Sequence, residues 1–102
     1  MFVTIWSYEV EPEHRLAFEA LYGESGPWVE LFRASPDYVR TILVIDPVRR
    51  NLYTSVDVWK TRAAYELFCD EQAAVYAALD DQGDALTKHE THLGTWQLSP
   101  DP

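Results

Sequence analysis

The sequence has little of several residue patterns, and each shortage excludes a class of protein. Its single cysteine, Cys69, cannot form a disulfide within the chain. The 8 Lys and Arg residues are outnumbered by 17 Asp and Glu, which gives a formal net charge of −9, and only Arg49 and Arg50 stand together in a predicted turn. Because nucleic acids and anionic membrane surfaces are bound by clustered cationic side chains, we expect neither as a partner.

Long apolar segments are also missing. No run approaches the roughly 18 apolar residues that a membrane-spanning helix needs, and no basic segment followed by an apolar run opens the chain. We therefore expect a cytoplasmic protein that makes no membrane contact. The length of 102 residues suits one domain, which we assign to residues 1–102.

Aromatic residues, by contrast, are abundant, with four Trp, six Tyr and four Phe. Such side chains bury large areas in cores, which is their commoner use, and they also form the walls of pockets for flat ligands. If a pocket exists, its expected substrate-binding residues are Trp6, Trp28, Tyr65, Phe68 and Trp96.

The pattern of apolar residues predicts alternating strands and helices. A strand over 2–10 is followed by a helix that opens at Glu11-Pro12-Glu13 and by a short helical piece from Pro27. The later elements are a strand over 37–46, a turn over 47–51, a strand over 52–59, a helix from Arg62 to about Thr87 with a bend near Asp70, and a strand over 90–98. Thr61 is the expected N-cap of that helix.

This β-α-β-β-α-β order predicts an α+β fold of the ferredoxin-like type, a four-stranded antiparallel sheet with both helices on one face. The strands are apolar on both of their faces: Ile42 and Val44 point one way, while Leu43 and Ile45 point the other. Since the helices cover one face only, we expect a second copy to cover the open face in a homodimer.

Two stretches of the sequence resemble a known family. The segments VDVWKTRAAYELF (56–68) and GPWVELFRASPDYV (26–39) resemble motifs of the antibiotic biosynthesis monooxygenase family, which lies within the dimeric α+β barrel superfamily. The resemblance extends over about residues 2–98. Members include cofactor-independent quinone-forming oxygenases, haem-degrading enzymes and proteins with no assigned reaction.

The resemblance implies different residues for each branch of the family. The haem-degrading branch needs Asn, Trp and a haem-ligating His where this sequence has Trp6, Phe68 and Ala78, so haem degradation is not expected. The quinone-forming branch works without metal or flavin, which implies no cofactor. It binds an electron-rich phenol in an aromatic pocket, removes a proton and lets the anion pass an electron to oxygen.

The sequence therefore leaves alternative functions open. One is a cofactor-independent monooxygenase that oxidises a polycyclic or quinol-like aromatic small molecule. Another is a non-catalytic homodimer that binds a small hydrophobic ligand or serves in stress or regulation. An isomerase or cyclase reaction of a superfamily relative has no residue pattern of its own in this chain.

Asp57 and His92 are the candidate proton acceptors. Regular alternation places Asp57 on one strand face with Tyr53, Ser55 and Trp59. A carboxyl buried there beside Trp59 would have a raised pKa and could accept a proton. The commoner role of such an Asp is to hydrogen-bond locally or to a neighbouring strand, and Trp59 itself is expected to be a packing residue.

His92 is the other candidate, because the intrinsic pKa of the histidine side chain suits a base near neutral pH, although a surface or interface role is the commoner one. Alternation along the last strand predicts that Glu90, His92 and Trp96 share a face and that His89 points to the other. Histidines on opposite faces do not form a metal site easily, so no metal is expected.

Overall fold

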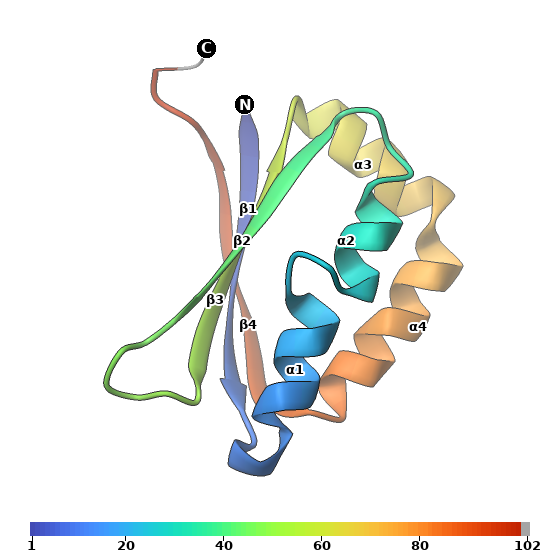
Figure 1. Cartoon of the computed structure of the whole chain (residues 1–102). Helices are drawn as coiled ribbons and strands as arrows, with labels where there is room; N and C mark the ends of the chain where they lie inside the picture. Colours follow the sequence, from blue (N-terminus) through green and yellow to red (C-terminus); the bar gives the residue numbers. More distant parts are fainter. Residues whose placement is uncertain (101–102) are drawn as a thin grey trace.

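The computed structural model describes residues 1–100 and contains one four-stranded sheet with helices packed on one of its faces (Figure 1). The elements, in chain order, are β1 Phe2–Val10, the short 3-10 helix η1 Pro12–His14, α1 Arg15–Tyr22, α2 Pro27–Phe32, β2 Tyr38–Ile45, β3 Leu52–Trp59, α3 Arg62–Glu71, α4 Ala73–Asp84 and β4 Thr87–Gln97.

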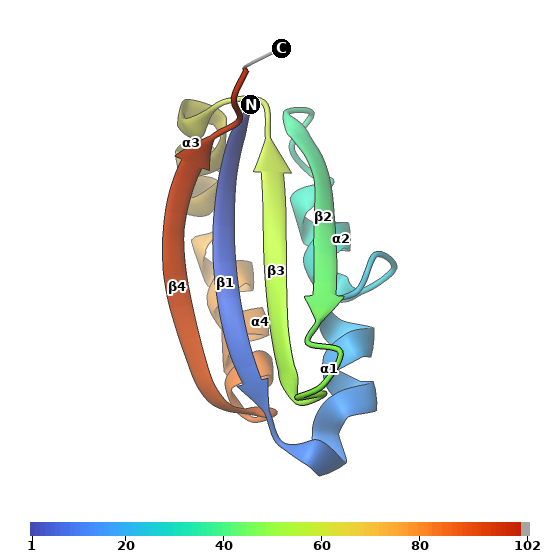
Figure 2. The ribbon, with the colours of Figure 1, turned by 90° about the vertical axis from the view of Figure 1, so that its left-hand side faces the viewer.

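The strand order across the sheet is β2-β3-β1-β4, and every neighbouring pair is antiparallel. Viewed onto the uncovered face of the sheet, the four strands lie in front, and the helices lie behind them or project beyond the edge at β2 (Figure 2). The predicted α+β ferredoxin-like architecture is therefore confirmed. The strand boundaries of β3 agree with the sequence pattern, and Thr61 Oγ1 accepts a hydrogen bond from the backbone N–H of Ala64 at 3.1 Å, as expected of the N-cap of α3.

Aromatic rings fill the space between the sheet and the helices. Trp59 and Phe18 are 0% exposed, and the Trp59 ring contacts Phe32, Tyr38, Tyr65 and Phe68. Trp59 is thus a packing residue, as the sequence predicted. A ring of this size buried against other rings stabilises the fold by roughly 2–3 kcal/mol from lost water contact alone.

Two element boundaries differ from the sequence-based prediction. The long second helix is interrupted at Gln72, whose non-helical backbone separates α3 from α4, and helix α4 ends at Asp84. The last strand begins at Thr87 rather than at residue 90, because Thr87 pairs with Val10 at the end of β1. The polar residues that begin β4 do not show the alternation of a buried strand, so this pairing was not visible in the pattern.

A β-bulge in β4 corrects the predicted faces of that strand. Trp6 pairs with His92, but the preceding residue of β1, Ile5, pairs with Gly94, so Leu93 has no pairing partner in β1. An extra residue reverses the alternation beyond it. Glu90 and His92 therefore face the helices, whereas Trp96 pairs with Val3 and lies on the open face, so the expectation that Trp96 shares their face is wrong.

The open face of the sheet carries apolar side chains that residues 1–100 leave partly exposed. Ile42 is 37% exposed, Val44 49% and Trp96 49%. Among the described residues, none of the helices is both long enough and apolar enough to cross a membrane.

Candidate functional site

A cavity lies between the helix-covered face of the sheet and helices α1, α2 and α4. Its empty space is about 370 Å³ when the open mouth is counted, but only about 20 Å³ is wide enough for a water molecule. The lining is largely aromatic, with a few carboxyl and hydroxyl groups among the rings. The residues that form it are Trp6, Tyr8, Tyr22, Trp28, Phe32, Thr41, Ser55, Asp57, Tyr76, Asp80 and Glu90.

Asp57 is the buried carboxyl of this cavity. It lies on β3, where regular alternation turns it toward the helices, and it is 8% exposed. Its Oδ1 accepts a hydrogen bond from Thr41 Oγ1 at 2.7 Å. Burial raises the pKa of Asp57 to about 6, and the hydrogen bond from Thr41 opposes that shift only in part. Asp57 can therefore exchange a proton near neutral pH, which an exposed aspartate cannot do.

Thr41 is placed opposite Asp57 by the hairpin of β2 and β3, in which the two residues are register partners. Its hydroxyl also contacts the Tyr38 hydroxyl at 2.8 Å. Since Thr41 gives its only hydroxyl proton to Asp57, the Tyr38 hydroxyl is the donor in that second contact. The carboxyl is thus held by a chain of two hydroxyl groups.

Glu90 is a second carboxyl in the cavity lining, at its β4 side. Partial burial and the neighbouring carboxyls of Asp80 and Asp84 on α4 together raise the pKa of Glu90 to about 7. The carboxylate oxygens of these three residues lie within 4.8 Å of one another, a spacing that a metal ion could bridge. A proton shared between Glu90 and Asp84 satisfies the same geometry without a metal.

The remaining polar atoms of the cavity wall divide into paired and unpaired groups. The Tyr8 and Ser55 hydroxyls are hydrogen-bonded to each other at 3.0 Å. Among the described residues, Trp28 Nε1 and Tyr22 Oη are buried without a hydrogen-bond partner of good geometry. The Trp28 N–H lies close enough to the Tyr22 hydroxyl to oppose the rise that burial causes in the Tyr22 pKa. An unpaired buried donor costs free energy, so a ligand that accepts a hydrogen bond there would be favoured.

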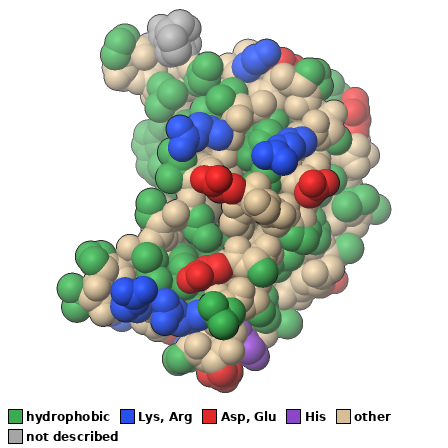
Figure 3. All heavy atoms as spheres, in the orientation of Figure 1, with side chains coloured by type: hydrophobic (Ala, Val, Ile, Leu, Met, Phe, Trp, Pro, Cys, Tyr) green, Lys and Arg blue, Asp and Glu red, His purple; other side chains and the backbone are tan. Residues whose placement is uncertain are grey.

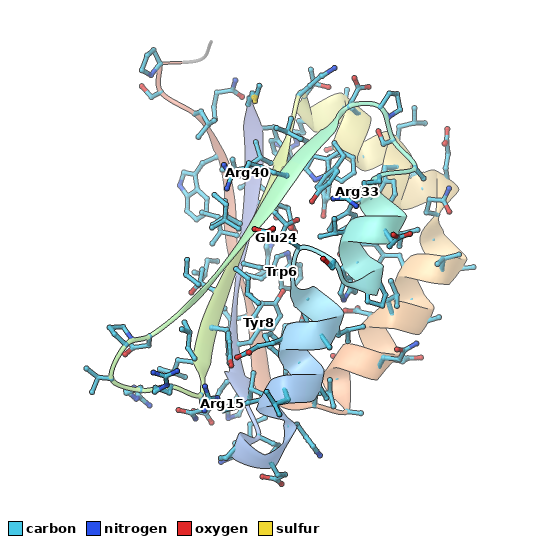
Figure 4. All side chains as sticks on the ribbon, viewed as in Figure 1. Trp6, Tyr8, Arg15, Glu24, Arg33 and Arg40 are labelled. Atoms are coloured by element: carbon cyan, nitrogen blue, oxygen red, sulfur yellow. The ribbon has the colours of Figure 1, made fainter. Side chains whose placement is uncertain are left out.

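Three of the predicted site residues line this cavity. Asp57, Trp6 and Trp28 come from β3, β1 and α2, respectively. Figure 4 shows Trp6 and Tyr8 projecting from β1 into the layer between the sheet and the helices. Trp6 and Asp57 meet in the cavity because alternation along β1 and β3 turns both side chains toward the helices.

His92 lies beside the cavity but does not line it. Its ring stacks on Trp6 with centroids 4.5 Å apart, and its Nε2 is hydrogen-bonded to Thr4 Oγ1 at 2.8 Å. The side chain is exposed, because β4 forms one edge of the sheet. A role for His92 as proton acceptor stays a prediction.

The other predicted substrate-binding residues lie elsewhere. Tyr65 and Phe68 pack in the core at the other end of the helical layer, with ring centroids 5.4 Å and 5.1 Å from Trp59. Trp96 is on the open face of the sheet because of the bulge. Within the single chain, these three side chains do not contribute to the cavity wall.

Several lining residues were missed in the sequence. Tyr8 and Ser55 stand two residues from Trp6 and Asp57, so the alternation that selected the latter pair could also have selected them. Thr41 could have been found from the hairpin register. Glu90 was placed on the correct face, but its raised pKa depends on Asp80 and Asp84, which a helix brings to it from a separate part of the chain.

Comparisons with known proteins give similarity in structure only. No protein-family model matches this sequence, and no curated protein matches it. The cofactor-independent oxygenase SnoaB from Streptomyces nogalater, in its N63A mutant, has a similar structure with a TM-score of 0.78 and 18% sequence identity, over 98% of this chain and 97% of that chain.

A second solved structure, described as an antibiotic biosynthesis monooxygenase, has a TM-score of 0.70 and 19% identity, over 98% of this chain and 100% of that chain. At this level of identity the comparison concerns the fold. The chain therefore has the fold of structures described as antibiotic biosynthesis monooxygenases, as the resemblance of its sequence motifs predicted.

Proposed function

We propose that this protein is a cofactor-independent monooxygenase that oxidises a phenolic or quinol-like polycyclic aromatic molecule, with Asp57 as the proton acceptor. The observation that carries the proposal is a buried carboxyl with a pKa of about 6 in the wall of an aromatic cavity. The similar fold of SnoaB, described as a cofactor-independent oxygenase, supports the same reaction class.

The proposed reaction begins with proton removal. Asp57 takes a proton from the aromatic substrate, which leaves an electron-rich anion. The anion gives one electron to dioxygen, and the substrate radical and superoxide then combine to a peroxide anion. This anion takes up one proton, matching the one removed at the start, and becomes a hydroperoxide. Loss of water from the hydroperoxide leaves a carbonyl group, so that one oxygen atom enters the product and the other leaves as water.

The cavity wall suits such a substrate. The rings of Trp6, Tyr8 and Trp28 offer flat apolar surfaces, and the unpaired Trp28 Nε1 can donate a hydrogen bond to a phenolate or carbonyl oxygen. The nearby carboxyl of Glu90, with a pKa of about 7, keeps a proton over part of the neutral range and so adds less negative charge around an anion.

One observation favours the alternative, a non-catalytic protein that binds a small hydrophobic ligand. Space of about 20 Å³ admits about one water molecule, so a polycyclic ligand must displace side chains to enter. A protein whose cavity never admits a substrate would have no use for a buried base. The two functions therefore differ in whether an aromatic ligand that enters the cavity is oxidised or only bound.

We further propose that the working form is a homodimer in which the open faces of two sheets pack together. The apolar side chains on that face, Ile42, Val44 and Trp96 among them, stay partly exposed in the part of the single chain that the structure describes. A flat sheet face is complementary in shape to a second copy of itself, which also gives the closed symmetry of a dimer.

The test is oxygen uptake by the metal-stripped protein with a panel of anthrones, naphthols and hydroquinones. We expect uptake above the autoxidation rate with formation of quinone. Asp57→Asn should lower kcat at least about tenfold, which corresponds to about 1.4 kcal/mol of barrier.

Two further variants make the assay decisive. Asp70→Asn, an exposed carboxyl on α3, is the matched control and should keep full turnover. If His92→Ala abolishes turnover while Asp57→Asn retains it, the proton acceptor is His92 and the assignment to Asp57 is wrong. Binding of the aromatic panel without any oxygen uptake would favour the alternative function.

A further inference from the structure

A buried carboxyl that titrates needs a route by which it exchanges its proton with solvent. Asp57 is 8% exposed and is surrounded by the titratable hydroxyls of Tyr8 on β1, Tyr38 on β2 and Tyr76 on α4, each of which its charge influences. The cavity beside it has only about 20 Å³ that is wide enough for water, room for about one water molecule, so it is a poor route for protons to reach the solvent.

The structure contains a second route through hydroxyl groups. Asp57 Oδ1 is 2.7 Å from Thr41 Oγ1, and Thr41 Oγ1 is 2.8 Å from Tyr38 Oη. Both distances are those of good O–H···O hydrogen bonds. Each hydroxyl has one proton to donate and lone pairs to accept, so each can receive one proton while it releases another.

The outer end of this chain lies in a separate groove beside the edge strand β2. The groove has a volume of about 430 Å³, and Thr41 and Tyr38 line it together with Glu24, Arg33 and Arg40. Figure 4 shows Glu24, Arg33 and Arg40 along this side of the molecule, between β2 and α2. Thr41 lines both the cavity and the groove, so it forms the partition between them.

The surroundings of the Tyr38 hydroxyl keep it protonated at neutral pH, so that it can both donate and accept a proton. Burial raises the pKa of Tyr38, and the hydrogen bond with Thr41 and the Arg33 and Arg40 guanidinium groups oppose the shift. Tyr38 therefore stays a neutral phenol at neutral pH, which can donate as well as accept. Basic and acidic side chains are interspersed on this face of the molecule, which leaves it well hydrated (Figure 3).

We propose that Thr41 and Tyr38 form a proton conduit between Asp57 and the solvent of the groove. With Asp57 ionised, Tyr38 donates to Thr41 and Thr41 donates to Asp57. Once Asp57 is protonated, the two hydroxyls rotate: Asp57 gives its proton to Thr41 Oγ1, Thr41 gives its own to Tyr38 Oη, and Tyr38 gives its own to a water or buffer base. One proton leaves, and Asp57 is a carboxylate again.

The conduit is a property of the folded chain, whereas its use in each turnover depends on the proposed function. The test therefore reads proton exchange at Asp57 without any substrate. In protein labelled with carbon-13 at the aspartate carboxyls, the Asp57 signal is followed by NMR as the pH passes through about 6. Fast exchange gives one averaged signal, and slow exchange gives separate or broadened signals.

We expect Thr41→Val, which keeps the branched shape but removes the hydroxyl, to slow this exchange at least about tenfold. Tyr38→Phe removes the outer hydroxyl and should slow it as well. Thr41→Ser restores a hydroxyl at the partition and should restore fast exchange. Tyr53→Phe is the matched control, since its hydroxyl lies on the same strand as Asp57 but donates to Glu19.

Amide spectra of each variant establish that the fold is unchanged. Exchange at the wild-type rate in both Thr41→Val and Tyr38→Phe would overturn the proposal. Slow exchange in Thr41→Val alone would also overturn it, since the route would then not pass through Tyr38. Because no turnover is measured, a missing oxygenase activity would count against the proposed function and leave this result intact.

Discussion

Asp57 occupies a strand position whose neighbours on the same face, Tyr53, Ser55 and Trp59, are all buried. Its carboxyl receives a hydrogen bond from Thr41, and no cationic side chain contributes to its pKa. A carboxyl in such a place lowers the stability of the fold when it ionises, because the charge loses its hydration. A functional role is one reason for a chain to keep it.

This cost leads to a prediction for stability. An aspartate pKa raised from 3.8 to about 6 means that the native state holds a proton which the unfolded state has already released. The free energy of unfolding therefore falls as the pH rises from about 3.8 to about 6 and stays low above that range. Asp57→Asn has no charge to bury and should be about 1–3 kcal/mol more stable at neutral pH.

Urea unfolding at several pH values and one fixed protein concentration measures this effect. The gain from Asp57→Asn should vanish below pH 3.8, where the carboxyl is protonated in both states. Asp70→Asn, on the exposed side of α3, should show no such pH dependence. An equal effect of Asp57→Asn at all pH values would mean that its carboxyl is not desolvated.

At the scale of elements, β4 determines which residues enter the site. Its bulge after His92 turns Trp96 away from the helices and leaves Glu90 and His92 on the inner face. Gly94 is the residue that allows this, with φ at +144°, a conformation that side chains other than glycine rarely adopt. Without the bulge, the residues beyond it would exchange faces.

Gly94→Ala tests that role. A Cβ at this position would lie 3.2 Å from the Trp96 ring, and the backbone would be strained at positive φ. We expect a loss of about 1–3 kcal/mol in the free energy of unfolding. For a domain of this size, that loss lowers Tm by at least about 4 °C.

Thermal unfolding of Gly94→Ala is compared with that of Leu93→Ala, which changes the neighbouring bulge residue at a side chain that is 51% exposed. The Leu93 variant should change Tm much less, because it removes little buried surface and adds no backbone strain. A Gly94→Ala protein with unchanged Tm would show that the bulge does not depend on glycine.

The whole molecule is a sheet with one covered and one uncovered face, and this imbalance underlies the proposed dimer. Packing two such sheets together would remove the exposed apolar surface of Ile42, Val44 and Trp96 from water. In that arrangement Trp96 would serve the assembly, while the cavity of each chain would remain between its own sheet and helices.

Equilibrium sedimentation at micromolar concentration should therefore give twice the chain mass of 11.8 kDa. Val44→Glu places a charge on the open face and should give the single-chain mass, since a buried unpaired carboxylate is costly. Leu16→Glu, at a helical position that is 83% exposed, adds the same charge elsewhere and should stay dimeric. A wild-type protein with the mass of one chain would exclude this dimer.

The sequence by itself determined the order of the elements and the inward faces of β1 and β3. Both follow from local rules, because alternation in a strand depends only on neighbouring residues. Asp57 and Trp6 could be selected in this way, and the chain order then led to the ferredoxin-like fold, which the structure confirms.

Only the tertiary structure decided the composition of the site. The bulge depends on pairing between β1 and β4 from opposite ends of the chain, and it separated Trp96 from His92. The raised pKa of Glu90 depends on carboxyls that α4 brings close, and the hydroxyl chain from Tyr38 to Asp57 depends on the register of β2 against β3. Such contacts join distant segments, so no local pattern in the sequence contains them.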